Sequence, residues 1–170
     1  ITGVSASEVE INSHIQFFDK ITSTDIQETL IKSAADLISE ESPNYQYVGG
    51  RLINYHLRKE VYGTFTPPCL CDIIDKNIDI GFYDKEFTEL YTKDEINQLQ
   101  EYIDHSRDEY LTYAAMEQFR GKYLVQNRAT GELFETPQVA YIMIAATLFS
   151  KYPADTRMKY VKAYYDAIST

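Results

Sequence analysis

The sequence predicts a mainly α-helical protein that contains one short β-hairpin. Apolar residues recur at intervals of three and four along most of the 170 residues, as they do on the buried face of an amphipathic helix. Two capping boxes, Ser5-x-x-Glu8 and Thr92-x-x-Glu95, indicate helix starts. Near residues 123–135 the period changes, and two short strands are expected there. An apolar fraction of 44% is typical of a globular protein rather than a disordered one.

Three helices are expected in residues 1–63. The first follows the box at Ser5, the second is capped by Ser23 or Thr24 and ends before Pro43, and the third spans 45–62 and stops at Gly63. Gly49-Gly50 inside the third helix predicts close approach of a neighbouring backbone, since glycine otherwise weakens a helix. The residues at helical spacing in the first two helices are Val9, Asn12, Ile15, Phe18, Ile26, Leu30, Ala34, Leu37 and Ile38.

Residues 64–170 begin with a break at Pro67-Pro68, because paired prolines cannot continue a helix. Helices are then expected around residues 73–80, after Thr92, over 112–119, from Thr136-Pro137 to about 150, and over 155–167. The predicted hairpin joins 123–126 to 132–135 through a turn at 128–131. The residues on the predicted buried faces of the first two of these helices are Ile73, Ile74, Asn77, Ile80, Ile96, Leu99 and Ile103.

Charge and composition exclude several classes of function. Acidic residues outnumber basic ones 26 to 16, and the net charge of −10 argues against nucleic-acid binding. No apolar run approaches the roughly 18 residues that a membrane-spanning helix requires. The two cysteines, Cys69 and Cys71, do not form a disulfide framework, so a reducing cytoplasm is expected. His14, His56 and His105 lack metal-ligand spacing with them, and no metal site is predicted.

Two pairs of residues are candidates for binding an anion. Tyr55 and Lys59 lie one helical turn apart on a stripe that is otherwise apolar, where the cation would meet a phosphate and the ring a base or ribose. The alternative is a lysine that extends to solvent near a helix C-terminus. Ser23 and Gln27 are one turn apart at a helix N-terminus, where free N–H groups suit an anion. The alternative is a helix cap beside a surface glutamine.

The run 104–108 contains acid, base and hydroxyl side chains, yet neighbours on one helix end rarely converge on a substrate. We therefore interpret Asp104, His105, Ser106, Arg107 and Asp108 as a solvated or interfacial charge cluster. No glycine-rich phosphate loop is present, because Gly49-Gly50 lies inside a predicted helix.

Five segments, in this order, resemble the large (alpha) subunit of class I ribonucleotide reductases near its N-terminus. They are residues 13–17, 29–38, 45–63, the hairpin region 122–138, and the closing run 165–170. The resemblance covers essentially the whole chain and points to the bacterial and bacteriophage class Ia enzymes.

The resemblance implies two domains and a regulatory site. Residues 1–63 would be a partial ATP cone whose opening hairpin is missing, and residues 64–170 the helical domain that flanks a ten-stranded barrel. ATP activates and dATP inhibits at such a cone. The family's effector-binding positions that match this sequence are Ser23, Gln27, Tyr55 and Lys59. Ser23 replaces Thr, Gln27 replaces His and Tyr55 replaces Phe, so a phosphate contact from His would be lost.

The same resemblance implies that no catalytic residue lies in this chain, because the barrel and its radical-bearing cysteine would lie beyond residue 170. Cys69 and Cys71 match none of the family's catalytic cysteines, so the chain alone is expected to be inactive. Tyr164-Tyr165 would be packing residues, since the family's redox tyrosines lie near its far C-terminus.

The expected partners are the remainder of the large subunit, a second large subunit in a dimer, and the radical-generating small (beta) subunit. The di-metal radical cofactor would belong to that small subunit, and ATP or dATP would bind here only as effectors. Two alternatives stay open. One is a stand-alone helical interaction module, and the other is a free ATP-cone-type nucleotide sensor.

Overall fold

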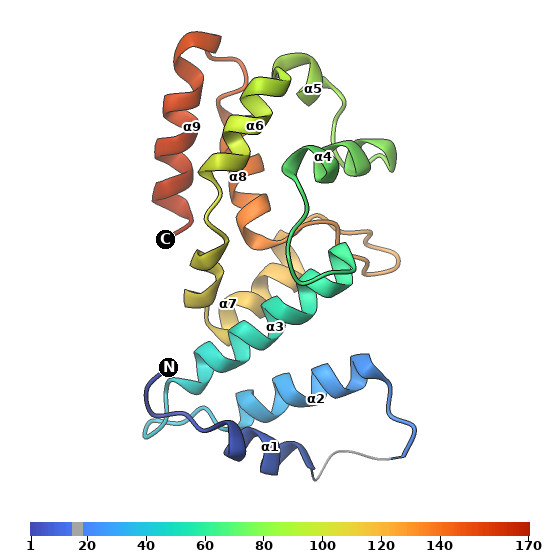
Figure 1. Cartoon of the computed structure of the whole chain (residues 1–170), viewed down its shortest axis with the longest axis vertical. Coiled ribbons are helices and arrows are strands. Elements are labelled where there is room, and N and C mark those ends of the chain that lie inside the picture. Colours follow the sequence, from blue (N-terminus) through green and yellow to red (C-terminus); the bar gives the residue numbers. More distant parts are fainter. Residues whose placement is uncertain (15–18) are drawn as a thin grey trace.

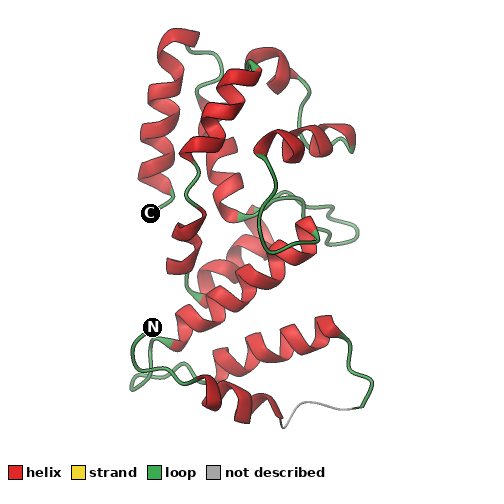
Figure 2. Cartoon of the chain, viewed as in Figure 1, coloured by secondary structure: helices red, strands yellow, loops and turns green. Residues whose placement is uncertain are grey.

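The computed structural model describes residues 1–14 and 19–170, and these residues are mainly helical, as predicted (Figures 1 and 2). The predicted helix positions Ile15 and Phe18 lie outside the described residues. In chain order the elements are α1 Ala6–His14, α2 Ser23–Asp36, α3 Tyr45–Tyr62, α4 Leu70–Asp79, α5 Glu86–Leu90, α6 Lys93–Tyr102, the 3₁₀ helix η1 His105–Tyr110, α7 Tyr113–Gln118, the π-helical turn η2 Phe119–Tyr123, α8 Pro137–Leu148 and α9 Ala154–Ile168.

Several helix ends follow their sequence signals. The Thr92 hydroxyl accepts a hydrogen bond from the Glu95 N–H at 3.2 Å, and the Glu95 carboxylate accepts one from the Thr92 N–H at 2.8 Å, which confirms the second capping box. Helix α3 ends at Gly63, whose φ of 70° places it in the left-handed region that favours glycine. Helix α8 begins at Pro137, with Thr136 as its N-cap residue.

Helix α2 departs from the prediction at both ends. Its N-cap is Thr22, rather than the predicted Ser23 or Thr24, and Thr22 forms a capping box with Asp25. The helix ends at Asp36 rather than continuing past Ile38. Beyond that end the Ser39 side chain accepts a hydrogen bond from the Ser42 N–H at 3.1 Å, a local bond that competes with further helix.

The predicted capping box at Ser5 is replaced by a contact between helices. The Ser5 N–H donates to the Tyr45 hydroxyl at 2.9 Å, and that hydroxyl donates to the Glu8 carboxylate. The Glu8 side chain therefore binds the first residue of α3 instead of returning to the start of α1. A tyrosine from a distant segment satisfies the N–H that a local cap would otherwise satisfy.

The hairpin forms with less strand structure than predicted. Its turn is closed by Asn127 N–H donating to the Glu132 carbonyl at 2.9 Å, and one antiparallel bridge pairs Gln126 with Leu133. The Val125 N–H donates to the Glu135 carboxylate at 3.0 Å. Because a side chain occupies this backbone donor, the two segments do not continue as a regular ladder.

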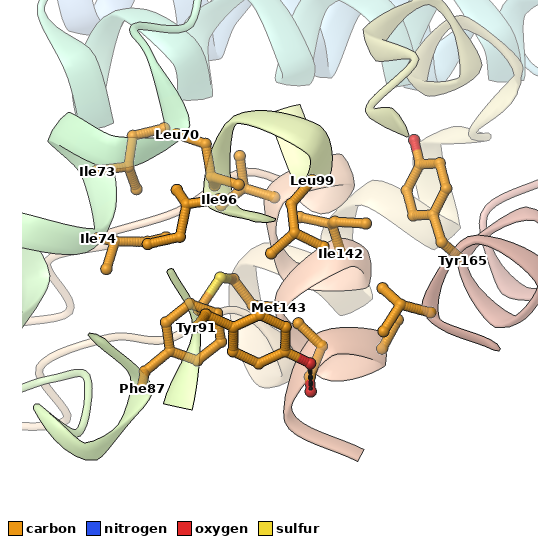
Figure 3. Packing of buried hydrophobic residues seen from close by; sticks show 14 of the residues in the cluster. Leu70, Ile73, Ile74, Phe87, Tyr91, Ile96, Leu99, Ile142, Met143 and Tyr165 are labelled. Carbon is orange, nitrogen blue, oxygen red and sulfur yellow. Dashed lines mark hydrogen bonds between the residues drawn. The ribbon is translucent and has the colours of Figure 1, made fainter. Parts of the chain in front are cut away.

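Figure 3 shows the largest hydrophobic cluster, which joins α4, α5, α6, α8 and α9. Leu99, Ile142 and Val161 are fully buried in it. The Tyr91 hydroxyl also enters the cluster and donates to the Ala146 carbonyl at 2.7 Å, which satisfies its polar tip. These helices form the upper part of the molecule in Figure 1, whereas α1 and α2 lie at the opposite end.

A second cluster, which we call the central cluster, joins residues on both sides of the predicted boundary at residue 63. Its buried members are Ile31, Ile53, Leu57, Val61, Met116, Leu124, Leu133 and Ala140. The prediction of close backbone approach at the glycine pair is confirmed, because a Cβ atom on Gly50 would lie 2.1 Å from the Leu111 carbonyl oxygen. The division of the chain into two domains, residues 1–63 and 64–170, stays a prediction.

Candidate functional site

The four predicted effector-binding residues lie at one end of the helical hairpin formed by α2 and α3. Ser23 is the first residue of α2 and Gln27 follows one turn later, whereas Tyr55 and Lys59 belong to the last part of α3. The helices run antiparallel, so the start of α2 and the end of α3 lie at the same side of the molecule (Figure 1). Nearby, His56 Nε2 and Glu28 Oε1 approach to 3.7 Å and connect the two helices.

Tyr55 and Lys59 are on the exposed side of α3. The apolar stripe through them is buried only in part, since Val48, Leu52 and Tyr62 are half-buried against the hydrophobic clusters. The most deeply buried side chains of this part of α3 are instead Ile53, Leu57 and Val61. A stripe read from spacing alone fits more than one face of an 18-residue helix when aromatic residues occur all around it. Both side chains are therefore accessible to a solute.

Phe65, which the sequence interpretation missed, completes an exposed group with these two residues. Its ring stacks on Tyr55 with centroids 3.8 Å apart and an interplanar angle of 12°. Lys59 Nζ lies 5.7 Å from the centroid of the Phe65 ring. Within the described part of the chain no carboxylate forms an ion pair with Lys59. The sequence did contain a signal for this residue, because Phe65 is apolar and lies in an otherwise polar stretch before Pro67-Pro68.

Ser23 does not cap α2, since Thr22 does. The side chain of Ser23 is exposed and Gln27 is half-buried. The Asp25 carboxylate accepts from the Thr22 N–H at 3.3 Å and adds negative charge to this helix start. An anion here would have to use the first N–H groups of the helix beside that carboxylate.

Behind this end of the hairpin, Arg120 pairs with two carboxylates. Its guanidinium lies 2.7 Å from Glu28 of α2 and 2.7 Å from Glu117 of α7. The hydrogen bond from Arg120 lowers the pKa of Glu28 against the opposing effect of burial. A polar hollow of about 480 Å³ between α2 and α7 is lined by Arg120 together with Asp25, Lys32 and Tyr113.

A buried polar network starts on α3 immediately before Lys59. Arg58 lies 3.2 Å from the Asp108 carboxylate, and Asp108 also accepts a hydrogen bond from Gln138 at 3.0 Å. Gln138 in turn accepts one from the Tyr165 hydroxyl at 2.6 Å. Burial raises the pKa of Asp108 to about 6, although both partners favour the charged form.

This network corrects the interpretation of the run 104–108. Asp104 and Ser106 are exposed, as expected of a surface cluster, but Asp108 is completely buried. Its partners are 50 residues upstream and 30 residues downstream, so no local pattern could indicate them. The packing role of Tyr165 fits the structure, since its ring is fully buried and its hydroxyl is bonded within the network.

The cysteines are the remaining candidates named from the sequence. Cys69 and Cys71 are free thiols at the start of α4. Among residues 1–14 and 19–170, no three or more His, Cys, Asp or Glu side chains are arranged to hold a metal ion. None of the helices described is both long enough and apolar enough to cross a membrane.

Similarity to known proteins indicates the family of this chain. Residues 109–170 match the family model described as the ribonucleotide reductase all-alpha domain. The ribonucleoside-diphosphate reductase 1 alpha subunit of Escherichia coli is 54% identical over 167 residues, which is 98% of this chain and 22% of that subunit. The corresponding subunits of Salmonella typhimurium and Haemophilus influenzae are 52% and 51% identical over all of the chain, again 22% of their length.

The chain belongs to the ribonucleotide reductase large-subunit family. The similarity extends across both predicted domains rather than residing in one motif, and it agrees with the order of segments seen in the sequence. The chain spans about a fifth of the length of these alpha subunits and corresponds to an N-terminal part of them.

Proposed function

We propose that this chain works as part of a ribonucleoside-diphosphate reductase alpha subunit and so takes part in reducing ribonucleotides to deoxyribonucleotides. One observation carries the proposal, namely the identity of about half of all residues across essentially the whole chain to alpha subunits of that name. The radical chemistry would take place in the four-fifths of the subunit outside this segment. The chain alone is then expected to be inactive.

The contribution of this segment would be regulatory. ATP or dATP would bind at the shared end of α2 and α3, with Lys59 facing the phosphates and the Tyr55–Phe65 stack beside the base or ribose. The exposure of Tyr55 and the absence of an ion-pair partner for Lys59 among the described residues support this assignment. Ser23 and Gln27 would approach from the start of α2.

The expected partners follow from the same proposal. They are the remainder of the alpha subunit, a second alpha subunit, and the small subunit, which would carry the di-metal radical cofactor. A stand-alone interaction module is the competing proposal, favoured by the acidic surface and by the large number of tyrosines. A free nucleotide sensor is disfavoured, because it would not need residues 109–170, which match the reductase helical domain.

A chimeric subunit tests the proposal. This chain would replace the aligned segment of the Escherichia coli alpha subunit, and reduction of a ribonucleoside diphosphate would be measured with that organism's small subunit. We expect activity within about tenfold of the parent and inhibition by dATP, since half of the residues are already shared. An inactive but correctly folded chimera would contradict the proposal.

Replacing Lys59 by Gln in this chimera tests the effector site. Because a charge-assisted contact to phosphate would be lost, dATP should bind roughly 10–100-fold more weakly while basal activity is kept. Lys93→Gln, on the exposed start of α6, is the matched control and should leave dATP binding unchanged. Equal dATP affinity in both variants would remove Lys59 from the site without affecting the reductase assignment.

A further inference from the structure

Helix α8 consists mostly of apolar residues, but only part of its surface is covered. Eight of its twelve residues are buried, as expected of a helix that consists mostly of apolar residues. Ile144 and Leu148, one turn apart, are nevertheless 52% and 56% exposed. Both are aliphatic residues, and removing their side chains from water would lower the free energy of the protein. The sequence of α8 therefore suits a helix with a neighbour on this side as well.

The exposed side of α8 continues into neighbouring elements. Tyr123 of η2 lines the same groove of about 840 Å³ as Ile144 and Leu148. Beyond the end of α8, Tyr152 and Tyr160 are 47% and 45% exposed and pack edge to face with centroids 5.5 Å apart. These five residues, which we call the α8 face, are five of the twelve large hydrophobic residues that the described structure exposes.

Phe149 and Tyr164 join the two parts of the α8 face. Tyr164 lines the groove, and the Phe149 ring lies 5.8 Å from the rings of both Tyr164 and Tyr160. The face is therefore continuous from η2 to α9. Contiguous exposed apolar surface of this kind marks an interaction site more often than scattered single residues do.

The groove has a satisfied polar wall and a charged rim. Glu135 is buried in the wall, where its carboxylate accepts hydrogen bonds from the Tyr83 hydroxyl and from the Val125 N–H. It needs no further donor, so the groove does not call for a basic ligand. At the rim, Lys151 and Glu86 form an exposed ion pair at 2.6 Å. An apolar centre with a polar rim is typical of protein–protein interfaces.

We propose that the α8 face is the surface on which an apolar segment from the other four-fifths of the reductase alpha subunit packs. This proposal rests on the proposed function. The related subunits are more than four times as long as this chain, so each offers a large covalently linked partner for the surface. A second copy of the chain is disfavoured, because two molecules that each carry a net charge of −10 repel one another.

Hydroxyl-radical footprinting of tyrosines tests the proposal without substitutions. Labelling would be compared between this chain by itself and the chimeric subunit, both without nucleotide. We expect the labelling of Tyr152 and Tyr160 to be at least about fivefold lower in the chimera, because residues buried in an interface are shielded from the radical. Tyr110 of η1, which is 77% exposed and lies outside both the α8 face and the proposed effector site, should be labelled equally in both. Unchanged labelling of Tyr152 and Tyr160 would overturn the proposal.

A pair of substitutions supplies a second measurement that does not depend on the short chain. Ile144→Asp should lower the melting temperature of the chimera by about 5 °C or more, because a carboxylate would enter an apolar interface. Ile11→Asp is the matched control, because the Ile11 side chain on α1 is 67% exposed. We expect it to change the melting temperature by less than about 2 °C. Equal tolerance of both substitutions would mean that the face is open to water.

The outcomes separate this inference from the proposed function. Neither labelling nor melting requires reductase activity, so an inactive chimera with a protected α8 face would contradict only the function. If sedimentation shows that the short chain dimerises and that Ile144→Asp makes it monomeric, a second copy is the occupant and our proposal is wrong.

Discussion

Gly50 is the residue on which the close contact between α3 and the segment before α7 depends. A methyl group at this position would lie 2.1 Å from the Leu111 carbonyl oxygen and 3.0 Å from the Thr112 carbonyl carbon. Both are backbone atoms, which cannot move aside as the end of a flexible side chain can. The entropic cost of glycine inside a helix is thus offset by packing that no larger residue permits.

We therefore expect Gly50→Ala to destabilise the chain by about 3 kcal/mol or more, in spite of the higher helix propensity of alanine. Gly121→Ala is the control, since no atom lies within 4 Å of its added Cβ atom and its φ is not positive. That variant should stay within about 0.5 kcal/mol of the parent. Urea unfolding monitored by circular dichroism measures both. Similar stabilities of the two variants would contradict the close contact.

At the scale of elements, the sequence predicted most helices and missed what depends on distant partners. Local signals at Thr92, Gly63 and Pro137 marked helix boundaries correctly, because caps and φ preferences act within a few residues. The 3₁₀ helix η1 was missed, since the Arg58 guanidinium that binds its Asp108 comes from α3. The stack of Phe65 on Tyr55 was missed for a similar reason, as the intervening chain must first turn at Gly63.

Element η1 should also make the stability depend on pH through His105. Burial, and then the nearby Arg58 cation, lower the pKa of His105 to about 4, from an ordinary value near 6.5. Its Nδ1 atom is buried without a hydrogen-bond partner among the described residues. Between pH 4 and 6.5 the unfolded chain binds more protons at this residue, so its contribution to stability is lost as the pH falls.

His105→Gln should consequently gain stability relative to the parent chain when the pH is lowered from 7 to 4.5, by roughly 1–3 kcal/mol. Contributions from groups that do not interact with His105 cancel in that difference. Urea unfolding at several pH values measures it, with the exposed, non-titrating Asn97→Ala on α6 as the control. A difference that is independent of pH would show that the pKa of His105 is the same in the folded and unfolded states, which would contradict the prediction.

At the scale of the whole molecule, the central cluster and the network at Asp108 connect the two predicted domains. Leu57 and Val61 of α3 pack with Met116, Leu124 and Leu133 from beyond residue 63. Arg58 joins the same helix to η1, α8 and α9 through Asp108. Shared burial of this kind makes unfolding cooperative, because the central cluster is complete only when both parts are folded.

We expect this chain to unfold in a single transition, with tyrosine fluorescence and far-ultraviolet circular dichroism giving the same midpoint. Leu57→Ala removes a fully buried side chain from the shared cluster and should cost about 2–5 kcal/mol. Hydrogen exchange should then accelerate by the same factor in α3 and in α9, although no residue of α9 belongs to the central cluster. Faster exchange confined to α1–α3 would instead show that the segments before and after residue 63 are independent folding units, as a boundary between two domains requires.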